Sequence, residues 1–163
     1  MSNIIFTDGS TLNNQDKNKR VGGIGVFYGD NDERNISEIL IENPTNQKAE
    51  LLACIRALEN CDKKNIIIYT DSKYVIGCMT EWLDNWKNNN WKNSKGKTIK
   101  NLELIKNLDV LCQNNIVKFI HVKAHQKMPN KNTENYKLWY GNKMADKLAT
   151  DAAKSYTSPS KFY

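Results

Sequence analysis

Short apolar runs separated by polar segments are the strongest pattern along this chain. Residues 4–6 and 66–69 are wholly apolar, which is typical of strands buried on both faces of a sheet, and residues 117–122 predict a further strand that leads to His125. Residues 21–28 are rich in branched, aromatic and glycine residues, and residues 35–41 partly alternate apolar with polar positions, so both predict strands. The three N-terminal strands have short connections, and we expect them to form an antiparallel meander.

Helical periodicity follows the third strand. A first helix is expected to begin at Thr45 as its N-cap and to carry an apolar stripe of Leu51, Leu52, Ile55 and Leu58. A second helix follows Asp71, a third carries Leu104, Leu108 and Leu111, and a fourth covers residues 142–153. Residues 126–140 are polar at first and predict a loop. The order β-β-β-α-β-α-α-β-α predicts an α/β fold with a mixed sheet, as one domain over residues 1–155 with a short tail at 156–163.

The composition and the distribution of charge indicate which class of partner the chain binds. Hydrophobic residues make up 39% and charged residues 26% of the chain, and no apolar run approaches the roughly 20 residues of a membrane span, so we expect no membrane association. The formal net charge is +6. Residues 86–100 contain no acid but hold Lys87, Lys92, Lys95, Lys97 and Lys100. Such a cluster favours a polyanionic partner.

The cysteines and the N-terminus bear on the compartment. The four cysteines, Cys54, Cys61, Cys78 and Cys112, form no C-x-x-C pair. Cys54 and Cys61 are expected on one helix about 10 Å apart, too far for a disulfide, and we interpret all four as free thiols in a reducing compartment. The first strand begins within about three residues of Met1, which leaves no length for a leader peptide. We therefore expect an intracellular protein, cytoplasmic or nuclear.

Four acids fall where a mixed sheet could bring them together. Asp8 and Asp71 each follow an apolar run, and Glu50 and Asp146 lie on predicted helices. Strand ends of an open α/β sheet carry ligand sites, and carboxylates massed there repel one another unless a cation binds. Mg²⁺ prefers carboxylate oxygens, and two such ions about 4 Å apart promote phosphodiester cleavage. Asp8 is the expected hub, at the tip of the first strand before a glycine turn at Gly9.

Each candidate also has an ordinary structural explanation. Asp8 before Gly9 could be a turn residue, and Asp71 before Ser72 could cap a helix. Glu50 and Asp146 could be solvated charges on helix surfaces, and His125 could be an ordinary loop histidine. The single residues leave these alternatives open.

Five motifs in a fixed order favour the metal site over the ordinary structural roles. They are FTDGS at 6–10, TNQKAE at 45–50, YTDS at 69–72, HVKAH at 121–125 and GNKMAD at 141–146. With them the chain resembles the type 1 ribonuclease H family, most closely the catalytic domain of the cellular eukaryotic-type enzymes. The resemblance implies a ribonuclease H-like fold, a five-stranded mixed sheet flanked by helices, with a basic protrusion. It also implies endonucleolytic cleavage of the RNA strand of RNA–DNA hybrids without sequence specificity, leaving 5′-phosphate and 3′-hydroxyl ends.

The resemblance also assigns roles to residues. It implies that two Mg²⁺ ions, with Mn²⁺ as a possible substitute, are held by Asp8, Glu50, Asp71 and Asp146, and that Asp8 bridges both. His125 would assist proton transfer or product release from a mobile loop. The implied substrate contacts are Tyr74 and Trp82 at a DNA sugar, Thr45 and Asn101 at a DNA phosphate, Asn14, Asn46 and Gln47 in the minor groove, and Lys92 in the protrusion.

The chain departs from the family pattern at two places. Asn43 stands where close relatives have an arginine in the phosphate pocket, which would weaken the hold on the DNA strand. The segment from His125 to Asp146 is about ten residues longer than usual, and its polar residues alone predict a flexible insertion, the default for a loop of this length. We expect its polar half to leave His125 tethered at one end only, and its bulky half, from Tyr136 to Tyr140, to pack near the acids.

Two other functions compete with a free-standing, monomeric nuclease. A non-catalytic hybrid-binding module would use the protrusion alone, but it would have no use for four acids near phosphate. A ribonuclease H domain cut from a reverse transcriptase would share the same motifs.

Overall fold

The computed structural model describes residues 3–13, 18–62 and 64–156. Five strands of this part of the chain form one sheet in the order β3-β2-β1-β4-β5. Their bounds are Asn3–Leu12 (β1), Val21–Phe27 (β2), Ile36–Leu40 (β3), Asn65–Thr70 (β4) and Ile116–His121 (β5). The β1–β2 and β2–β3 pairs are antiparallel, and the β1–β4 and β4–β5 pairs are parallel. The predicted meander and the mixed five-stranded sheet are confirmed.

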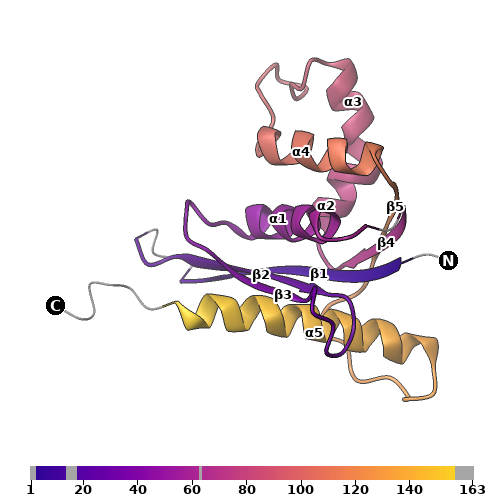
Figure 1. Cartoon of the computed structure of the whole chain (residues 1–163). Coiled ribbons are helices and arrows are strands. Elements are labelled where there is room, and N and C mark those ends of the chain that lie inside the picture. Colours follow the sequence, from indigo (N-terminus) through magenta and orange to yellow (C-terminus); the bar gives the residue numbers. More distant parts are fainter. Residues whose placement is uncertain (1–2, 14–17, 63, 157–163) are drawn as a thin grey trace.

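Helices cover both faces of the sheet (Figure 1). α1 (Asn46–Glu59) packs on one face with α4 (Leu102–Gln113) against it, and α5 (Glu134–Ser155) lies along the other face. The layer between the sheet, α1 and α4 is filled by buried aliphatic side chains, namely Ile5, Ile24, Val26, Leu51, Ile55, Ile66, Ile68, Ile105 and Leu108. Burial of each such side chain contributes about 1.5–3 kcal/mol, so this layer is the main source of stability.

The contact between α5 and the sheet is made by small residues. A Cβ atom added to Gly25 would lie 2.1 Å from the Ala145 carbonyl oxygen, so the β2 backbone touches the helix directly. A smaller cluster of Phe6, Phe27 and Ala145 fills the rest of this face. The close approach brings Asp146, the residue after Ala145, to the level of β1 and β2.

The prediction of a loop through residue 140 is wrong in its second half. α5 begins at Glu134, and the Thr133 hydroxyl caps it by accepting the Tyr136 N–H at 3.3 Å. The buried side of the helix consists of Gly141, Asn142, Ala145, Ala149, Ala152 and Ala153. These side chains are too small or too polar to show as an apolar stripe in the sequence, which therefore predicts the helix only from residue 142.

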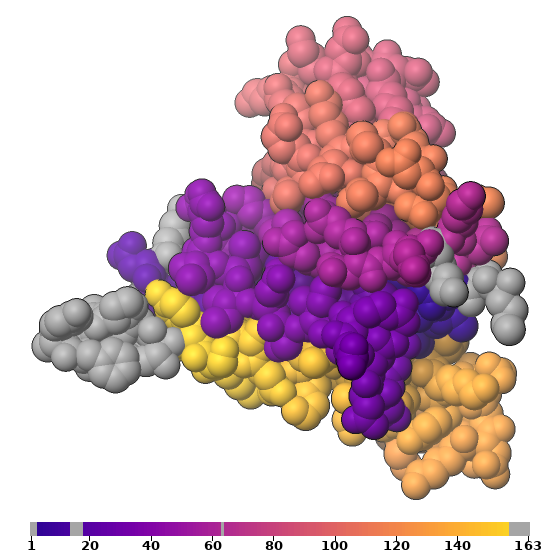
Figure 2. Space-filling model, viewed as in Figure 1, coloured from indigo at the N-terminus to yellow at the C-terminus, as the bar shows by residue number. Residues whose placement is uncertain are grey.

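The segment between β4 and β5 carries the protrusion. The segment consists of α2 (Lys73–Ile76), the π-helical η1 (Gly77–Trp82) and α3 (Leu83–Asn88), a loop, and α4, and the protrusion is α3 with the loop. In the space-filling view, α3 and the following loop form a lobe that stands away from the sheet (Figure 2). Ile99 at the base of this loop is buried, and Trp91 packs on the same core, so the lobe is anchored. The expected basic protrusion is confirmed as a structural element.

Three smaller expectations need correction. β1 does not end in a turn after Asp8 but continues through Gly9 to Leu12. Ile4 is 46% exposed, so the start of β1 is covered on one face only. Cys61 lies beyond the end of α1, because that helix stops at Glu59. All four cysteines are free, as expected.

No helix within the described ranges is both long and apolar enough to cross a membrane. Of the expected tail at 156–163, only Tyr156 belongs to the described residues, where it ends α5.

Candidate active site

Three carboxylates meet where β1 and β4 part. The parallel pairing of these strands ends with Thr7 opposite Thr70, so Asp8 and Asp71 are the next residue of each chain segment. Glu50 reaches the same place from α1. One carboxylate oxygen from each of Asp8, Glu50 and Asp71 can be chosen so that all three lie within 4.8 Å of one another. The fold therefore brings together acids that are 42 and 21 positions apart in the sequence (50 − 8 and 71 − 50).

Gly9 allows this approach. A Cβ atom at Gly9 would lie 2.5 Å from the Glu50 nitrogen, so the first turns of α1 rest directly on the β1 backbone. The Gly9 N–H donates to Asp8 Oδ1 at 2.9 Å and also to Glu50 Oε1. Thr45 begins α1, and its hydroxyl accepts the Lys48 N–H at 3.1 Å, as predicted for an N-cap. Glycine at position 9 thus serves close contact between strand and helix.

Asp146 completes the group from the other face of the sheet. It lies on α5 and lines the same cavity as Asp8, Glu50 and Asp71. Asp8 therefore has all three other acids around it, since Glu50 and Asp71 also act on it. The four predicted acids are together, and the explanations of Asp8 as a turn residue and Glu50 as a surface charge do not hold.

The electrostatics of the group are unfavourable without a cation. Asp8 is 5% exposed, and burial first, then the charges of Glu50 and Asp71, raises the pKa of its carboxyl well above the ordinary value. Burial, followed by the Asp71 charge, also raises the pKa of Glu50, although its hydrogen bonds with Asp8 and the Gly9 N–H work against this shift. Burial raises the pKa of Asp71, helped by the charge of Asp146, whereas hydrogen bonds with Asn142 and Asp8 oppose the shift. These carboxyl groups ionise with difficulty unless a cation neutralises their charges. Their oxygens are the ligands that a hard divalent cation such as Mg²⁺ prefers.

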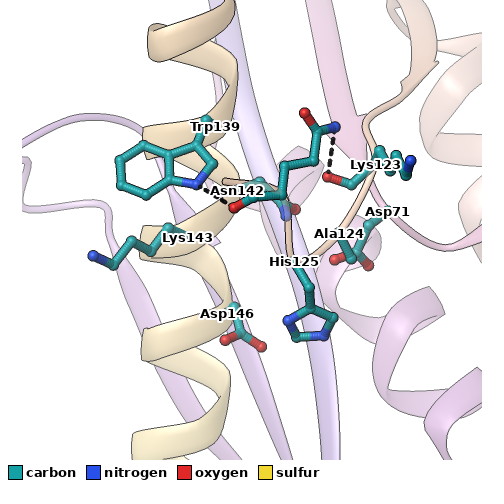
Figure 3. Close-up of a pocket in the computed structure, with 9 residues that line it drawn as sticks. Asp71, Lys123, Ala124, His125, Trp139, Asn142, Lys143 and Asp146 are labelled. Carbon is teal, nitrogen blue, oxygen red and sulfur yellow. Dashed lines mark hydrogen bonds between the residues drawn. The ribbon is translucent and has the colours of Figure 1, made fainter. Parts of the chain in front are cut away.

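Two cavities open beside the acids. One of about 400 Å³ is lined by Asp8, Gly9, Asn46, Gln47, Glu50, Asp71, Ser72, Lys73, Tyr74, Ala124, His125 and Asp146. The other, of about 220 Å³, is lined by Asp71, Lys123, Ala124, His125, Gln126, Trp139, Asn142, Lys143 and Asp146 (Figure 3). His125 is exposed and borders both, beside Asp71 and Asp146. Of the predicted substrate residues, Asn46, Gln47 and Tyr74 share the larger cavity with the acids.

The predicted aromatic contact with a DNA sugar, made by Tyr74 and Trp82, lies at a neighbouring cavity that shares Tyr74 with the cavity of the acids. Tyr74 and Trp82 line a hollow of about 420 Å³, and Trp82 is 40% exposed there. The six-membered part of the Trp82 ring lies over Gly77, where a Cβ atom would come within 2.4 Å of it. Asn101 precedes α4 in a left-handed conformation, and its amide donates to the Tyr74 hydroxyl at 3.0 Å. Burial raises the pKa of Tyr74 to about 12, so this hydroxyl stays protonated.

The remaining predicted contacts are less concentrated. Lys92 is exposed and lines a hollow of about 530 Å³ with Trp82 and Trp86. Thr45 is half-buried as the cap of α1. Asn46 hydrogen-bonds through its side chain to the Thr11 hydroxyl. Asn14 lies outside the described residues.

The expectation that His125 is tethered at one end only is wrong. Before it, Val122 is buried and its N–H donates to the Thr70 carbonyl at 2.9 Å. After it, the Gln126 carbonyl accepts the Trp139 indole N–H at 3.1 Å (Figure 3). The loop is held on both sides because α5 begins early enough to carry Trp139.

The sequence reasoning missed several residues of the smaller cavity. These are Lys123, Gln126, Trp139, Asn142 and Lys143. Positions 139, 142, 143 and 146 follow the spacing of one helix face, so a helix extended to residue 134 would have grouped them with Asp146. Asn142 is buried, and its Oδ1 has no hydrogen-bond partner among the described residues.

A mixed α/β sheet with an all-carboxylate cluster at its centre defines the chain as a protein with a candidate divalent-metal site. The RNase H family model matches residues 1–154, and the chain belongs to the RNase H family.

Similar proteins support this membership. The chain is 41% identical over 151 residues to a "Ribonuclease H" of Schizosaccharomyces pombe, which covers 92% of this chain and 52% of that protein. It is 39% identical over 150 residues to a "Ribonuclease H" of Ruthia magnifica subsp. Calyptogena magnifica, covering 90% and 91%. A foamy viral protease-reverse transcriptase superimposes with a TM-score of 0.68 at 25% identity, over 94% of this chain and 20% of that one. The chain thus spans about half the length of the Schizosaccharomyces pombe relative.

Proposed function

We propose that this chain is an endoribonuclease that cleaves the RNA strand of RNA–DNA hybrids, with residues 1–155 as its catalytic domain. The observation that carries the proposal is the group of Asp8, Glu50 and Asp71, whose carboxylate oxygens lie within 4.8 Å of one another in a chain of the RNase H family. The foamy viral structure with the same fold is a complex with an RNA/DNA hybrid. That likeness supports the same class of substrate here.

The four acids are the proposed metal ligands. Asp8 neighbours Glu50, Asp71 and Asp146, which supports its role as the ligand shared by two ions. Bound Mg²⁺ would supply Lewis-acid activation of a water and stabilisation of the leaving oxygen, giving 5′-phosphate and 3′-hydroxyl ends. Mn²⁺ takes similar oxygen ligands and is the expected substitute. The protein contributes a rigid mount, since each acid comes from a strand, a strand end or a packed helix.

His125 is the proposed proton-transfer group. Its ring is exposed at the mouth of both cavities, beside Asp71 and Asp146. An exposed imidazole exchanges protons with water and can also follow the product phosphate as it leaves. These properties suit assistance in proton transfer or in product release.

The cavities form a track suited to a long substrate. The acid cavity and the Trp82 hollow share Lys73 and Tyr74, and the Trp82 hollow joins the Lys92 hollow at Trp82 itself. A hybrid could therefore lie across these linked cavities, with its RNA strand at the acids and its DNA strand at the Trp82 and Lys92 hollows. Tyr74 and Trp82 would stack on the DNA strand, the Asn46 and Gln47 amides would reach the minor groove, and Lys92 would contact phosphate. Thr45 and Asn101 are proposed phosphate contacts, and Asn14 a minor-groove contact.

The test is an assay with three labelled substrates, an RNA–DNA hybrid, double-stranded RNA and double-stranded DNA, each with Mg²⁺. We expect cleavage of the RNA in the hybrid alone. Binding of the hybrid with no cleavage in Mg²⁺ or Mn²⁺ would support the non-catalytic module instead. Cleavage of either homoduplex at a similar rate would contradict hybrid specificity. Sedimentation of the free protein tests the expected monomer, and the intracellular location stays a prediction.

A further inference from the structure

The loop that carries His125 is closed by two fixed points. The N-terminal point is Val122, which is buried and hydrogen-bonded to Thr70 at the end of β4. The C-terminal point is the Gln126 carbonyl, which accepts the indole N–H of Trp139. The Gln126 side chain also turns back and donates to the Lys123 carbonyl at 3.2 Å, which tightens the loop between the two points (Figure 3).

His125 needs this closure because its backbone is strained. Its φ angle is +55°, in the left-handed region that residues other than glycine enter at a cost. Such a conformation persists only where the surrounding structure imposes it. Gln126 is the next residue along the chain, and its backbone carbonyl is the group to which the Trp139 indole donates. The indole bond therefore acts one residue away from the strained position.

Trp139 is itself held firmly. Its ring packs against Tyr136 with centroids 5.5 Å apart, and the Lys143 ammonium lies 5.0 Å from its centre on the next turn of α5. Tyr136 stacks on Tyr140 at 6.1 Å, and Tyr140 meets Phe27 of the sheet edge-on at 5.9 Å. A chain of aromatic contacts thus joins the indole to the core, which gives it the rigidity that a tether requires.

We propose that Trp139 is a positioning residue for His125, acting through the Gln126 carbonyl. The N-terminal turns of α5 place the Trp139 indole beside this carbonyl. This inference rests on the proposed function, because it assigns His125 a part in cleavage. Trp139 would touch neither substrate nor metal. It would raise the fraction of time in which the imidazole lies at the cavity beside Asp71 and Asp146.

The test is a double-mutant cycle between Trp139→Phe and His125→Ala, measured as hybrid cleavage at saturating Mg²⁺. Trp139→Phe keeps an aromatic ring against Tyr136 and Lys143 but removes the donor. Removal of one hydrogen bond predicts a fall in kcat of about 3- to 10-fold, with KM changed by less than about 2-fold. In the His125→Ala background the same substitution should have no further effect. An unchanged kcat, or an equal fall in both backgrounds, would overturn the proposal.

Tyr140→Phe is the matched control. It removes the hydrogen bond from the Tyr140 hydroxyl to Asp30, on the same turns of α5, without touching the His125 loop. We expect it to leave kcat unchanged. A fall in kcat equal to that of Trp139→Phe would show that general loosening of α5, rather than the tether, is responsible.

A readout without substrate separates this inference from the proposed function. We expect ¹⁵N heteronuclear NOE values at residues 124–126 to fall in Trp139→Phe and to stay at the wild-type level in Tyr140→Phe. If the wild-type protein cut no hybrid, the proposed function would fail while these values still measured the tether. Unchanged loop mobility in Trp139→Phe would overturn the positioning role whatever the cleavage assay shows.

Discussion

Asp8 is the side chain on which the other acids converge. It is almost fully buried, and both burial and the neighbouring charges of Glu50 and Asp71 oppose its ionisation. A group in this position stores unfavourable electrostatic energy in the folded protein until a cation binds. Removing its charge should therefore affect catalysis and stability in opposite directions.

The catalytic consequence is loss of cleavage. We expect Asp8→Asn to reduce kcat by about 10³-fold or more, because the amide keeps the size of the side chain but not the charge that holds metal. Hybrid affinity should stay equal or improve, since one negative charge near the phosphates is gone. Single-turnover cleavage and a filter-binding titration measure the two effects. A variant that kept a tenth of the wild-type rate would contradict the role of Asp8 as the shared ligand.

The stability consequence depends on pH. The pKa of Asp8 is raised from its ordinary value of 3.8, so the folded state holds a proton that the unfolded state has already released. The free energy of unfolding of the metal-free protein should therefore fall as pH rises above about 4. Asp8→Asn lacks the part of this fall that Asp8 contributes, while Glu50 and Asp71 keep theirs. Its melting temperature in EDTA should exceed that of the wild type at pH 7, with a smaller gap at pH 4.

Added Mg²⁺ is the control for that comparison. It should raise the melting temperature of the wild type at pH 7 far more than that of Asp8→Asn, because binding to the folded state stabilises it. A gap between the two proteins that did not change with pH would mean that Asp8 ionises freely in the folded protein.

The contact between β1 and α1 is the element that assembles the site. Gly9 lies under the Glu50 backbone, and a methyl group there would displace the helix. We expect Gly9→Ala to cost about 1–3 kcal/mol of stability by overpacking, a fall of roughly 3–10 °C in melting temperature. The shift of Glu50 should lower kcat by about 10-fold or more. Ser10→Ala, one residue along β1, is the control and should change neither quantity greatly.

Strands and motifs can be predicted here because their signals are local. The apolar run of β4 and the cap at Thr45 follow from a few neighbouring residues. The start of α5 cannot be predicted in this way, because the buried side of the helix consists of glycine, alanine and one asparagine. The sequence predicts a turn at Gly9 because glycine permits turns, whereas its role is contact with a helix about 40 positions away. The family motifs group the four acids, and the geometry of the sheet then brings them together.

The molecule as a whole presents two faces with different tasks. The acids, the Trp82 hollow and the protrusion follow one another along linked cavities, while most of α5 covers the opposite side of the sheet. The protrusion lysines are exposed, and no carboxylate of the described chain pairs with Lys92, Lys95 or Lys97. The Asn93 side chain accepts the backbone N–H groups of Lys95 and Lys97, at 2.9 and 3.0 Å, which orders the loop that presents them.

These lysines should therefore hold substrate without taking part in chemistry. We expect replacement of Lys92, Lys95 and Lys97 together by glutamine to raise KM several-fold while kcat changes little, because they bind ground state and transition state alike. The logarithm of the binding constant falls linearly with the logarithm of salt concentration. The slope should flatten by up to about one unit for each phosphate that the variant no longer neutralises.

A second triple variant separates local contact from net charge. Lys118, Lys147 and Lys154 are exposed. Lys147 and Lys154 lie on α5. Lys118 lies on β5 between Val117 and Phe119, which pack into the layer with α1 and α4, so Lys118 is on the α5 side of the sheet. Glutamine at these positions removes the same charge from the far side of the sheet, so long-range attraction falls while every lysine that faces a phosphate stays in place. We expect KM and the salt slope to stay near the wild-type values. Equal slopes for the two triple variants would mean that the protrusion acts only through overall charge, and that the hybrid does not follow the linked cavities to Lys92.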